Sequence, residues 1–193
     1  RISLKNCPEG PHSFTWIGYS GNAKRLAGLQ RFYAKLPVEV IKVVRDPKGD
    51  DFGPKRTYKY PIGFEGLKSL DLTECRLAKQ GNKLLLDISF AAPFSKSWNP
   101  PLGFDHLQLM VLLQLNGEKG APLFAEANYK VASPTSFTHL ISLNGWQIQS
   151  FEASPTGTFI SKAAIPTLLL TGANSMRLML DPALLNYPVD IQS

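Results

Sequence analysis

Three aspartates, Asp46, Asp50 and Asp51, lie within six positions of one another. Carboxylates crowded into one loop repel one another unless a cation or hydrogen bonds compensate their charge. Calcium suits such a loop, because it takes about six to eight oxygen ligands from carboxylates, carbonyls and water, and Gly49 permits the tight backbone curvature that turns carbonyls inward. Residues 46–49 also fit a plain β-turn in which Asp accepts backbone hydrogen bonds. The residue types leave both interpretations open.

Tryptophans next to amide side chains form the second chemical pattern. A sugar ring has an apolar face that an exposed indole can cover while nearby polar groups bond its hydroxyls. The candidates are Trp98 with Asn99, and Trp146 with Gln147 and Gln149. Core packing is the alternative, because Trp98 lies in a Pro-rich segment and Trp146 begins an apolar, strand-like one.

Signatures of common enzymes are absent from the sequence. There is no P-loop, dinucleotide-binding fingerprint, metalloprotease helix or nucleophile elbow. The histidines at positions 12, 106 and 139 are too dispersed to indicate a catalytic triad. Glycosidases need two facing carboxylates, and nothing singles out a pair among Asp71, Glu74, Asp87 and Asp105. We therefore do not expect an enzyme.

The two cysteines, Cys7 and Cys75, lack the spacing of a zinc site or a redox motif. One bridge between them is open if the protein is exported, although spacing alone cannot establish its geometry. The chain starts at Arg1 without the pattern of a secretory leader. We expect a mature product or a piece cut from a longer protein.

The net charge of +6 is unevenly distributed along the chain. Residues 1–59 hold 12 basic and 5 acidic side chains, which leaves 9 basic and 10 acidic side chains for residues 60–193. Binding to nucleic acid usually involves runs or clusters of like charge, and here the basic residues are scattered singly or in pairs. A solvated basic face is the simpler interpretation, and we expect no nucleic-acid partner.

Alternating apolar and polar residues dominate the chain from about residue 38 onward, and this pattern is typical of half-buried strands. About nine strands separated by Gly, Pro, Asn and Ser predict an all-β fold, an antiparallel β-sandwich of the jelly-roll kind. Both faces of residues 107–115 are apolar, which predicts a central strand. The predicted strands are 38–44, 70–77, 83–90, 107–115, 124–131, 138–143, 146–153, 158–164 and 175–180.

Residues 1–37 are predicted to be an N-terminal arm or linker, and residues 38–193 the β domain. Within the arm, the spacing of Leu26, Leu29, Tyr33 and Leu36 predicts one short helix over residues 22–36. No apolar stretch approaches the roughly 18 residues that a membrane-spanning helix needs, so we expect no transmembrane segment.

Five stretches, in order and with matching spacing, resemble the C-terminal module of glucodextranase. They are Asp-Pro-x-Gly-Asp-Asp-x-Gly-Pro at 46–54, Tyr-x-Tyr-Pro at 58–61, Leu-Asp-Leu-Thr at 70–73, Ala-Pro-Phe-x-x-x-Trp-Asn-x-Pro-x-Gly-Phe at 92–104, and Asn-Gly-Trp at 144–146. The resemblance covers about residues 43–165. It extends to a wider group that includes family-nine carbohydrate-binding modules and DOMON-like sandwiches.

The resemblance implies a noncatalytic, calcium-stabilised accessory module that binds a polysaccharide or a cell-surface glycan. Modules of this kind are often appended to glucan- or starch-active glycoside hydrolases, so a catalytic domain in the same polypeptide is a possible partner. The implied location is extracellular, periplasmic or at the cell surface. Carried over by position, Asp46, Asp50 and Asp51 are the expected metal ligands. Residues 105–107 are a departure, because relatives often have Gln soon after Gly-Phe.

Two other functions stay open at the level of sequence. Some DOMON relatives hold haem between Met and His and transfer electrons, and this chain has Met110, Met176, Met179 and three histidines without a telling spacing. Alternatively, the chain is a structural domain that only docks a neighbouring catalytic domain, with the basic arm as its contact.

Overall fold

The structure is a computed structural model of the whole chain, and it describes residues 10–20, 23–34, 37–52, 57, 59, 63, 70–114, 120–124, 129–130 and 136–181. The chain divides into two compact units, Arg1–Val38 and Glu39–Ser193. The described residues form strands and connections, without an α-helix, and none of them builds a helix suited to crossing a membrane. The predicted all-β class is confirmed.

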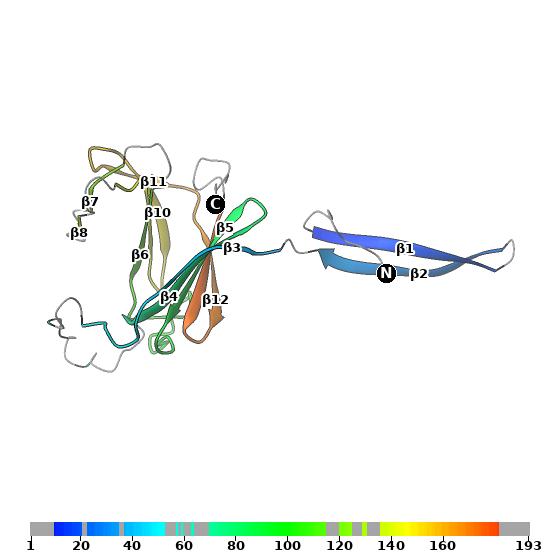
Figure 1. The fold of residues 1–193 in the computed structure, drawn as a ribbon, viewed down its shortest axis with the longest axis horizontal. Helices are drawn as coiled ribbons and strands as arrows, with labels where there is room; N and C mark the ends of the chain where they lie inside the picture. Colours follow the sequence, from blue (N-terminus) through cyan, green and yellow to red (C-terminus); the bar gives the residue numbers. More distant parts are fainter. Residues whose placement is uncertain are drawn as a thin grey trace. The chain divides into compact units, whose positions relative to one another are not determined.

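The N-terminal unit contains an antiparallel hairpin of β1 (Gly10–Ser20) and β2 (Ala23–Ala34), drawn in blue in Figure 1. The predicted helix over residues 22–36 is therefore wrong. The pairing shifts between Trp16 and Ile17, so that Trp16 pairs with Gly28 and Ile17 with Leu26. This bulge adds one residue to β2 and changes its local period from two to three. The step of three residues from Leu26 to Leu29, which crosses the bulge, therefore does not by itself indicate a helix, and Leu36 lies outside the described residues.

One layer of the second unit is a five-stranded antiparallel sheet in the order β12-β13-β5-β4-β3. Its strands are β3 (Glu39–Arg45), β4 (Leu72–Gln80), β5 (Lys83–Phe90), β12 (Thr167–Gly172) and β13 (Ser175–Leu180). The sequence pattern missed β12, because three consecutive leucines hide its alternation. In the structure Leu168 and Leu170 pack against the core and Leu169 is exposed.

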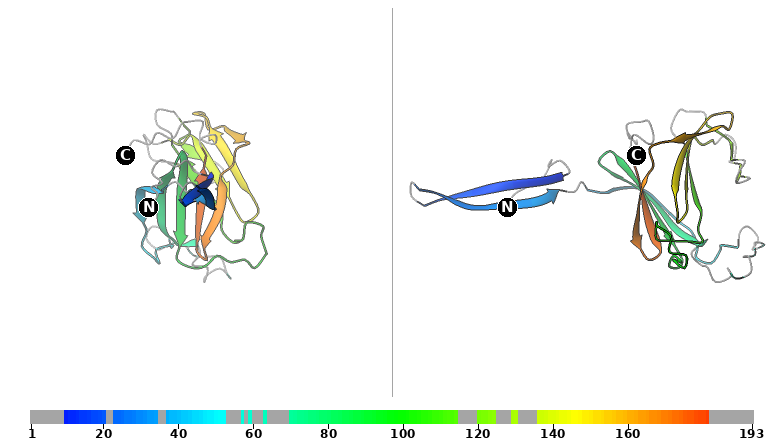
Figure 2. Two further views of the ribbon diagram at one scale, coloured as in Figure 1. Left: turned by 90° about the vertical axis from the view of Figure 1, so that its right-hand side faces the viewer. Right: turned by 180° about the vertical axis from the view of Figure 1, so that it is seen from behind.

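The facing layer is a four-stranded antiparallel sheet in the order β11-β10-β9-β6 (Figures 1 and 2). Its strands are β6 (Leu109–Leu113), β9 (His139–Leu143), β10 (Ile148–Ala153) and β11 (Phe159–Lys162). Two short strands, β7 (Leu123–Phe124) and β8 (Tyr129–Lys130), pair only with each other among the described strands and belong to neither sheet.

The prediction that residues 107–115 form a central strand is wrong, because β6 ends the four-stranded sheet among the described strands. Both of its faces are apolar for another reason. Leu109, Val111 and Leu113 pack against the main core, whereas Leu112 packs against a second cluster that contains Phe137. The apolar residues on both faces of β6 are therefore explained by packing against two clusters at the sheet edge, and not by a neighbouring strand on each side.

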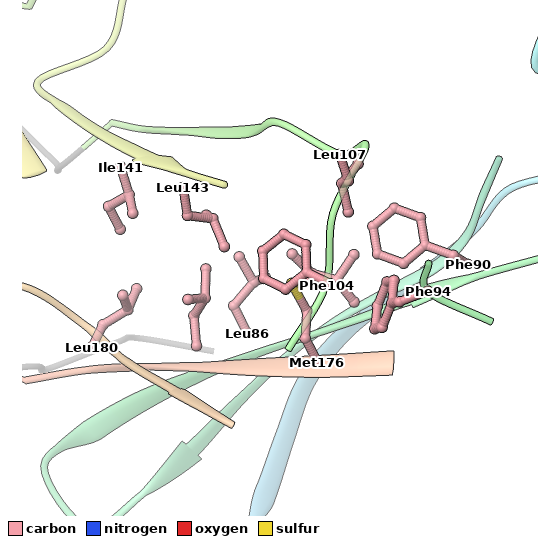
Figure 3. Close-up of a cluster of buried hydrophobic side chains, with 11 residues drawn as sticks. Leu86, Phe90, Phe94, Phe104, Leu107, Ile141, Leu143, Met176 and Leu180 are labelled. Atoms are coloured by element: carbon pink, nitrogen blue, oxygen red, sulfur yellow. The ribbon is translucent and has the colours of Figure 1, made fainter. Parts of the chain in front are cut away.

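The main core fills the space between the two sheets. Its fully or nearly buried side chains come from β5, β9 and β13 and from the connection between β5 and β6. Figure 3 shows this cluster, with Phe104 near its centre. The rings of Phe90 and Phe94 lie 5.4 Å apart in an edge-to-face contact, and those of Phe94 and Phe104 lie 5.7 Å apart. The connection is therefore anchored in the core at Phe94 and again at Phe104.

Substitution of Phe104 by Ala should lower the free energy of unfolding by about 3 to 5 kcal/mol, because it removes a fully buried ring and leaves a cavity. Urea denaturation at neutral pH measures this change. Ile165→Ala is the control, since that side chain is exposed between strands and should alter stability by less than about 0.5 kcal/mol. Equal effects of the two substitutions would contradict the central role of Phe104.

Candidate functional site

Trp98 lies in the long connection between β5 and β6, residues 91–108, which we call the Trp98 loop. Phe94 and Phe104 anchor this loop in the core on both sides of Trp98. Next to the anchors, Ser95 and Asp105 form an isolated antiparallel bridge, with the Asp105 N–H donating to the Ser95 carbonyl at 2.9 Å. The loop therefore folds back on itself and presents residues 96–103 at its tip.

Asp105 is the polar centre of the Trp98 loop and is fully buried. Its Oδ2 accepts the backbone N–H of Trp98 at 2.7 Å, and its Oδ1 accepts Nδ1–H of His106 at 2.6 Å. Burial by itself raises the pKa of Asp105, but hydrogen bonds from Ser95, Trp98 and His106, together with the charge of His106, lower it below its ordinary value. The ionised carboxylate therefore organises the loop.

Trp146 lies in the connection between β9 and β10, residues 144–147, which we call the Trp146 turn. Asn144 Oδ1 accepts the backbone N–H groups of Trp146 at 2.9 Å and Gln147 at 3.1 Å. This Asx turn is local chemistry that Asn favours. It fixes the backbone that carries the indole, while the side chains of Gln147 and Gln149 remain exposed beside it.

The Trp98 loop and the Trp146 turn are in contact through their backbones. The Leu102 N–H donates to the carbonyl of Gly145 at 2.9 Å. A Cβ at Gly145 would lie only 1.9 Å from the carbonyl oxygen of Phe104, so only Gly permits this approach. The core residue Phe104 thereby sets the spacing between the two tryptophan-bearing segments.

Together these segments present two exposed indoles, which we call the indole platform. Trp98 is 61% exposed and Trp146 is 49% exposed. Their ring centroids lie 6.0 Å apart, with 42° between the ring planes. The ring of His106 lies 4.2 Å from that of Trp98. Asn99, also exposed, follows Trp98 with a positive φ of 49°.

The acidic loop, residues 46–51, follows the edge strand β3. Asp46 and Asp50 are exposed and Asp51 is half-buried. Gly49 has a φ of 89°, the left-handed conformation expected of a glycine at this turn. Across the part of the chain that the structure describes, no group of three or more His, Cys, Asp or Glu side chains is placed to hold a metal ion. The three carboxylates are thus near one another in sequence without forming a ligand cluster.

Asp71 is a fourth carboxylate against the acidic loop. Its side chain is 1% exposed, and its Oδ2 accepts the N–H of Gly49 at 2.8 Å. Its Oδ1 is buried and has no hydrogen-bond partner among the residues that the structure describes. A second backbone bond, from the Asp46 N–H to the Thr73 carbonyl at 2.9 Å, fastens the same loop beside β4. Asp71 therefore belongs to the same candidate site as the acidic loop.

The predicted sugar-binding residues Trp98, Asn99 and Trp146 are brought together at the surface, so core packing does not explain either indole. Sequence reasoning did not single out Asp105, His106 or Asp71, because burial of a carboxylate leaves no periodic signal. The available hints were that residues 105–107 depart from the resembling pattern and that Asp71 lies in its stretch at 70–73.

Other candidate residues stand apart from these two sites. Met176 is buried in the main core and Met110 is exposed on β6, and the haem hypothesis stays a prediction. Cys75 is a free, half-buried cysteine. Its burial, and then the charge of Asp87, raise the pKa of its thiol. Cys7 and residues 53–56 lie outside the described residues.

Residues 41–184 match the sequence model of a family described as the C-terminal binding module, SLH-like, of glucodextranase. The match spans 144 of the 193 residues, about three quarters of the chain. It includes the acidic loop, the Trp98 loop and the Trp146 turn. No individual curated protein matches the chain.

The lowered pKa of Asp105 predicts acid-dependent stability. A carboxyl group with a lower pKa in the folded state stabilises the fold above its ordinary pKa of 3.8, and that contribution is lost as the pH falls through the lowered value. The stability difference between wild type and Asp105→Asn should therefore shrink as the pH falls below about 3.8. Urea titrations at a series of acidic pH values measure it. A difference that stays constant down to the lowest pH would contradict the assignment.

Proposed function

Because this chain belongs to the family of the SLH-like C-terminal binding modules of glucodextranase, we propose that it is a noncatalytic carbohydrate-binding module that uses the indole platform. The observation that supports this most directly is the exposure of two neighbouring indoles whose backbones are fixed by hydrogen bonds. Trp98, Asn99 and Trp146 are the proposed ligand contacts.

Exposed indoles in contact with each other favour a ligand with an apolar face. Trp buries a large apolar area when it is covered, and an exposed cluster of such side chains typically marks a binding surface. A pyranose ring offers a face of C–H groups with hydroxyls around its edge. The amides of Asn99, Gln147 and Gln149 stand next to the indoles in sequence and are exposed, so they can bond those hydroxyls.

The spacing of the indoles indicates how the ligand lies. A sugar ring between two parallel rings needs about 7 to 8 Å, twice the contact distance of roughly 3.5 to 4 Å between carbon atoms. The centroids of Trp98 and Trp146 are only 6.0 Å apart. We therefore propose that the ligand lies across both indoles. An oligosaccharide of at least two residues should bind more tightly than a monosaccharide.

Trp98→Ala and Trp146→Ala should each weaken glycan binding by roughly tenfold or more, since central aromatic residues usually carry most of the binding energy. Retardation in affinity gels with soluble α-glucans, β-glucans and cell-wall polysaccharides identifies the ligand, and calorimetry with its oligosaccharides gives the Kd. Ile165→Ala, an exposed apolar residue outside the platform, is the matched control. Unchanged binding in the double tryptophan variant would refute this site.

We also propose that calcium stabilises the module through Asp46, Asp50 and Asp51, with Asp71 as an additional ligand. The support is the buried Oδ1 of Asp71, which has no hydrogen-bond partner in the described part of the chain. The other carboxylate oxygen of Asp71 accepts the N–H of Gly49 in the acidic loop. A buried carboxylate oxygen without a partner is costly, and a divalent cation bound there would offset that cost. Because Asp46, Asp50 and Asp51 do not form a ligand cluster among the described residues, the acidic loop would have to close around the ion. Ligands from loop carbonyls would complete such a site.

Calcium should raise the melting temperature of chelator-treated protein by roughly 5 to 10 °C when its concentration is about 100 times Kd. Asp50→Asn/Asp51→Asn and Asp71→Asn should each reduce that shift. Asp71→Asn keeps an acceptor for the Gly49 N–H, so a smaller calcium shift in this variant reflects the loss of the carboxylate charge. Asp181→Asn, at the end of β13, is the control. A full calcium shift in the double variant would place the ion elsewhere.

We further propose that the module serves a glucan-active glycoside hydrolase outside the cytoplasm. The family description supports this, because it places such modules at the C-terminus of glucodextranase. A module that binds a polymer raises the effective concentration of an attached catalytic domain at its substrate.

A further inference from the structure

We propose that Asp105 and His106 are positioning residues that hold Trp98 in the orientation used for binding. The inference rests on the proposed function of the indole platform. It assigns a role to two residues that do not themselves need to touch the ligand.

The first step is the link from Asp105 to the backbone of Trp98. The carboxylate has no exposed surface, and its Oδ2 accepts the Trp98 N–H at 2.7 Å across seven residues of chain. Because this bond is formed by an ionised carboxylate in a buried position, it is stronger than a bond between neutral groups. It fixes the position from which the indole projects.

The second step is the link from Asp105 to the ring of His106. Oδ1 accepts Nδ1–H at 2.6 Å, which sets the orientation of the imidazole. The His106 side chain is only 13% exposed, and its ring centroid lies 4.2 Å from that of Trp98, with 42° between the planes. The imidazole therefore packs against the indole, and the carboxylate holds the imidazole in place.

The backbone of the loop supports the same conclusion. Asn99 and His106 are the two residues other than Gly with positive φ among the described residues, at 49° and 60°. Such conformations are uncommon for residues other than Gly and persist only where the surroundings hold them. Both residues are next to a partner in the Trp98–Asp105 hydrogen bond, and each makes a bond of its own: the Asn99 N–H donates to the Lys96 carbonyl at 3.0 Å, and His106 bonds Asp105.

Holding Trp98 in advance matters for affinity. A side chain that is already ordered in the free protein does not lose conformational entropy when the ligand binds. The binding free energy is more favourable by that amount. Removal of the support should therefore weaken binding while Trp98 itself is still present. A residue needed only for folding would lower stability and leave the affinity of the folded molecules unchanged.

His106→Asn and Asp105→Asn separate these roles. Asn at 106 keeps a donor near the position of Nδ1 and tolerates a positive φ, but it removes the ring under Trp98. Asn at 105 keeps an acceptor for the Trp98 N–H, whereas Asp105→Ala removes both bonds. Lys96→Ala, at an exposed position in the same loop, is the control.

Two measurements on the full chain test the proposal. Acrylamide quenching of Trp98 is measured in a Trp16→Phe/Trp146→Phe background, so that Trp98 is the sole indole. We expect His106→Asn and Asp105→Ala to increase quenching and shift the emission to longer wavelength, with Asp105→Asn in between. The second measurement keeps all three tryptophans and uses the oligosaccharide that the wild type binds. The Kd of the His106→Asn variant should be roughly three- to tenfold higher than that of the wild type.

The outcomes distinguish this inference from the proposed function. If no glucan or cell-wall polysaccharide binds the wild type, the proposed function fails, and quenching alone then decides whether the pair positions Trp98. If, in the Trp16→Phe/Trp146→Phe background, Trp98 emission and quenching are the same with and without His106→Asn or Asp105→Ala, the positioning role is refuted. The positioning role is also refuted if these variants have a lower melting temperature than the wild type but bind the ligand with unchanged affinity.

Discussion

Burial of Phe104 between the two sheets is the constraint on which the candidate binding surface depends. The ring belongs to the main core, while the backbone around it belongs to the surface loops. Its carbonyl lies against Gly145, and the residue that follows it is the buried Asp105. The same burial that stabilises the sandwich therefore brings the Trp98 loop and the Trp146 turn together.

Two buried carboxylates, Asp105 and Asp71, differ in how completely they are hydrogen-bonded. Asp105 accepts hydrogen bonds at both oxygens, and this lowers its pKa despite the cost of burial. Asp71 is almost equally buried, but one of its oxygens has no hydrogen-bond partner among the described residues. Because a buried polar atom without a partner is costly, Asp105 is a fully hydrogen-bonded structural element, whereas Asp71 keeps one buried oxygen that its described neighbours do not satisfy.

Much of the fold could be predicted because half-buried strands leave an alternating pattern. Residues 83–90 alternate clearly and form β5, and most of the other predicted strands coincide with observed ones within a few residues. The pattern failed where packing departs from simple alternation. In β2, the step from Leu26 to Leu29 across the bulge resembles helical spacing. In β12, three consecutive leucines obscure the alternation, and β6 is apolar on both faces although it lies at a sheet edge.

The sequence by itself determined the all-β class, the approximate positions of most strands of the second unit and the residue types suited to binding a sugar. These follow from local periodicity and side-chain chemistry, which neighbouring residues carry. Only the tertiary structure decided that Trp98 and Trp146, 48 positions apart, share one surface. It also decided that Asp105 and Asp71 are buried and that Asp46, Asp50 and Asp51 do not gather into a cluster. Exposure and contact depend on which segments pack together, and that information lies in the long-range packing around Phe104.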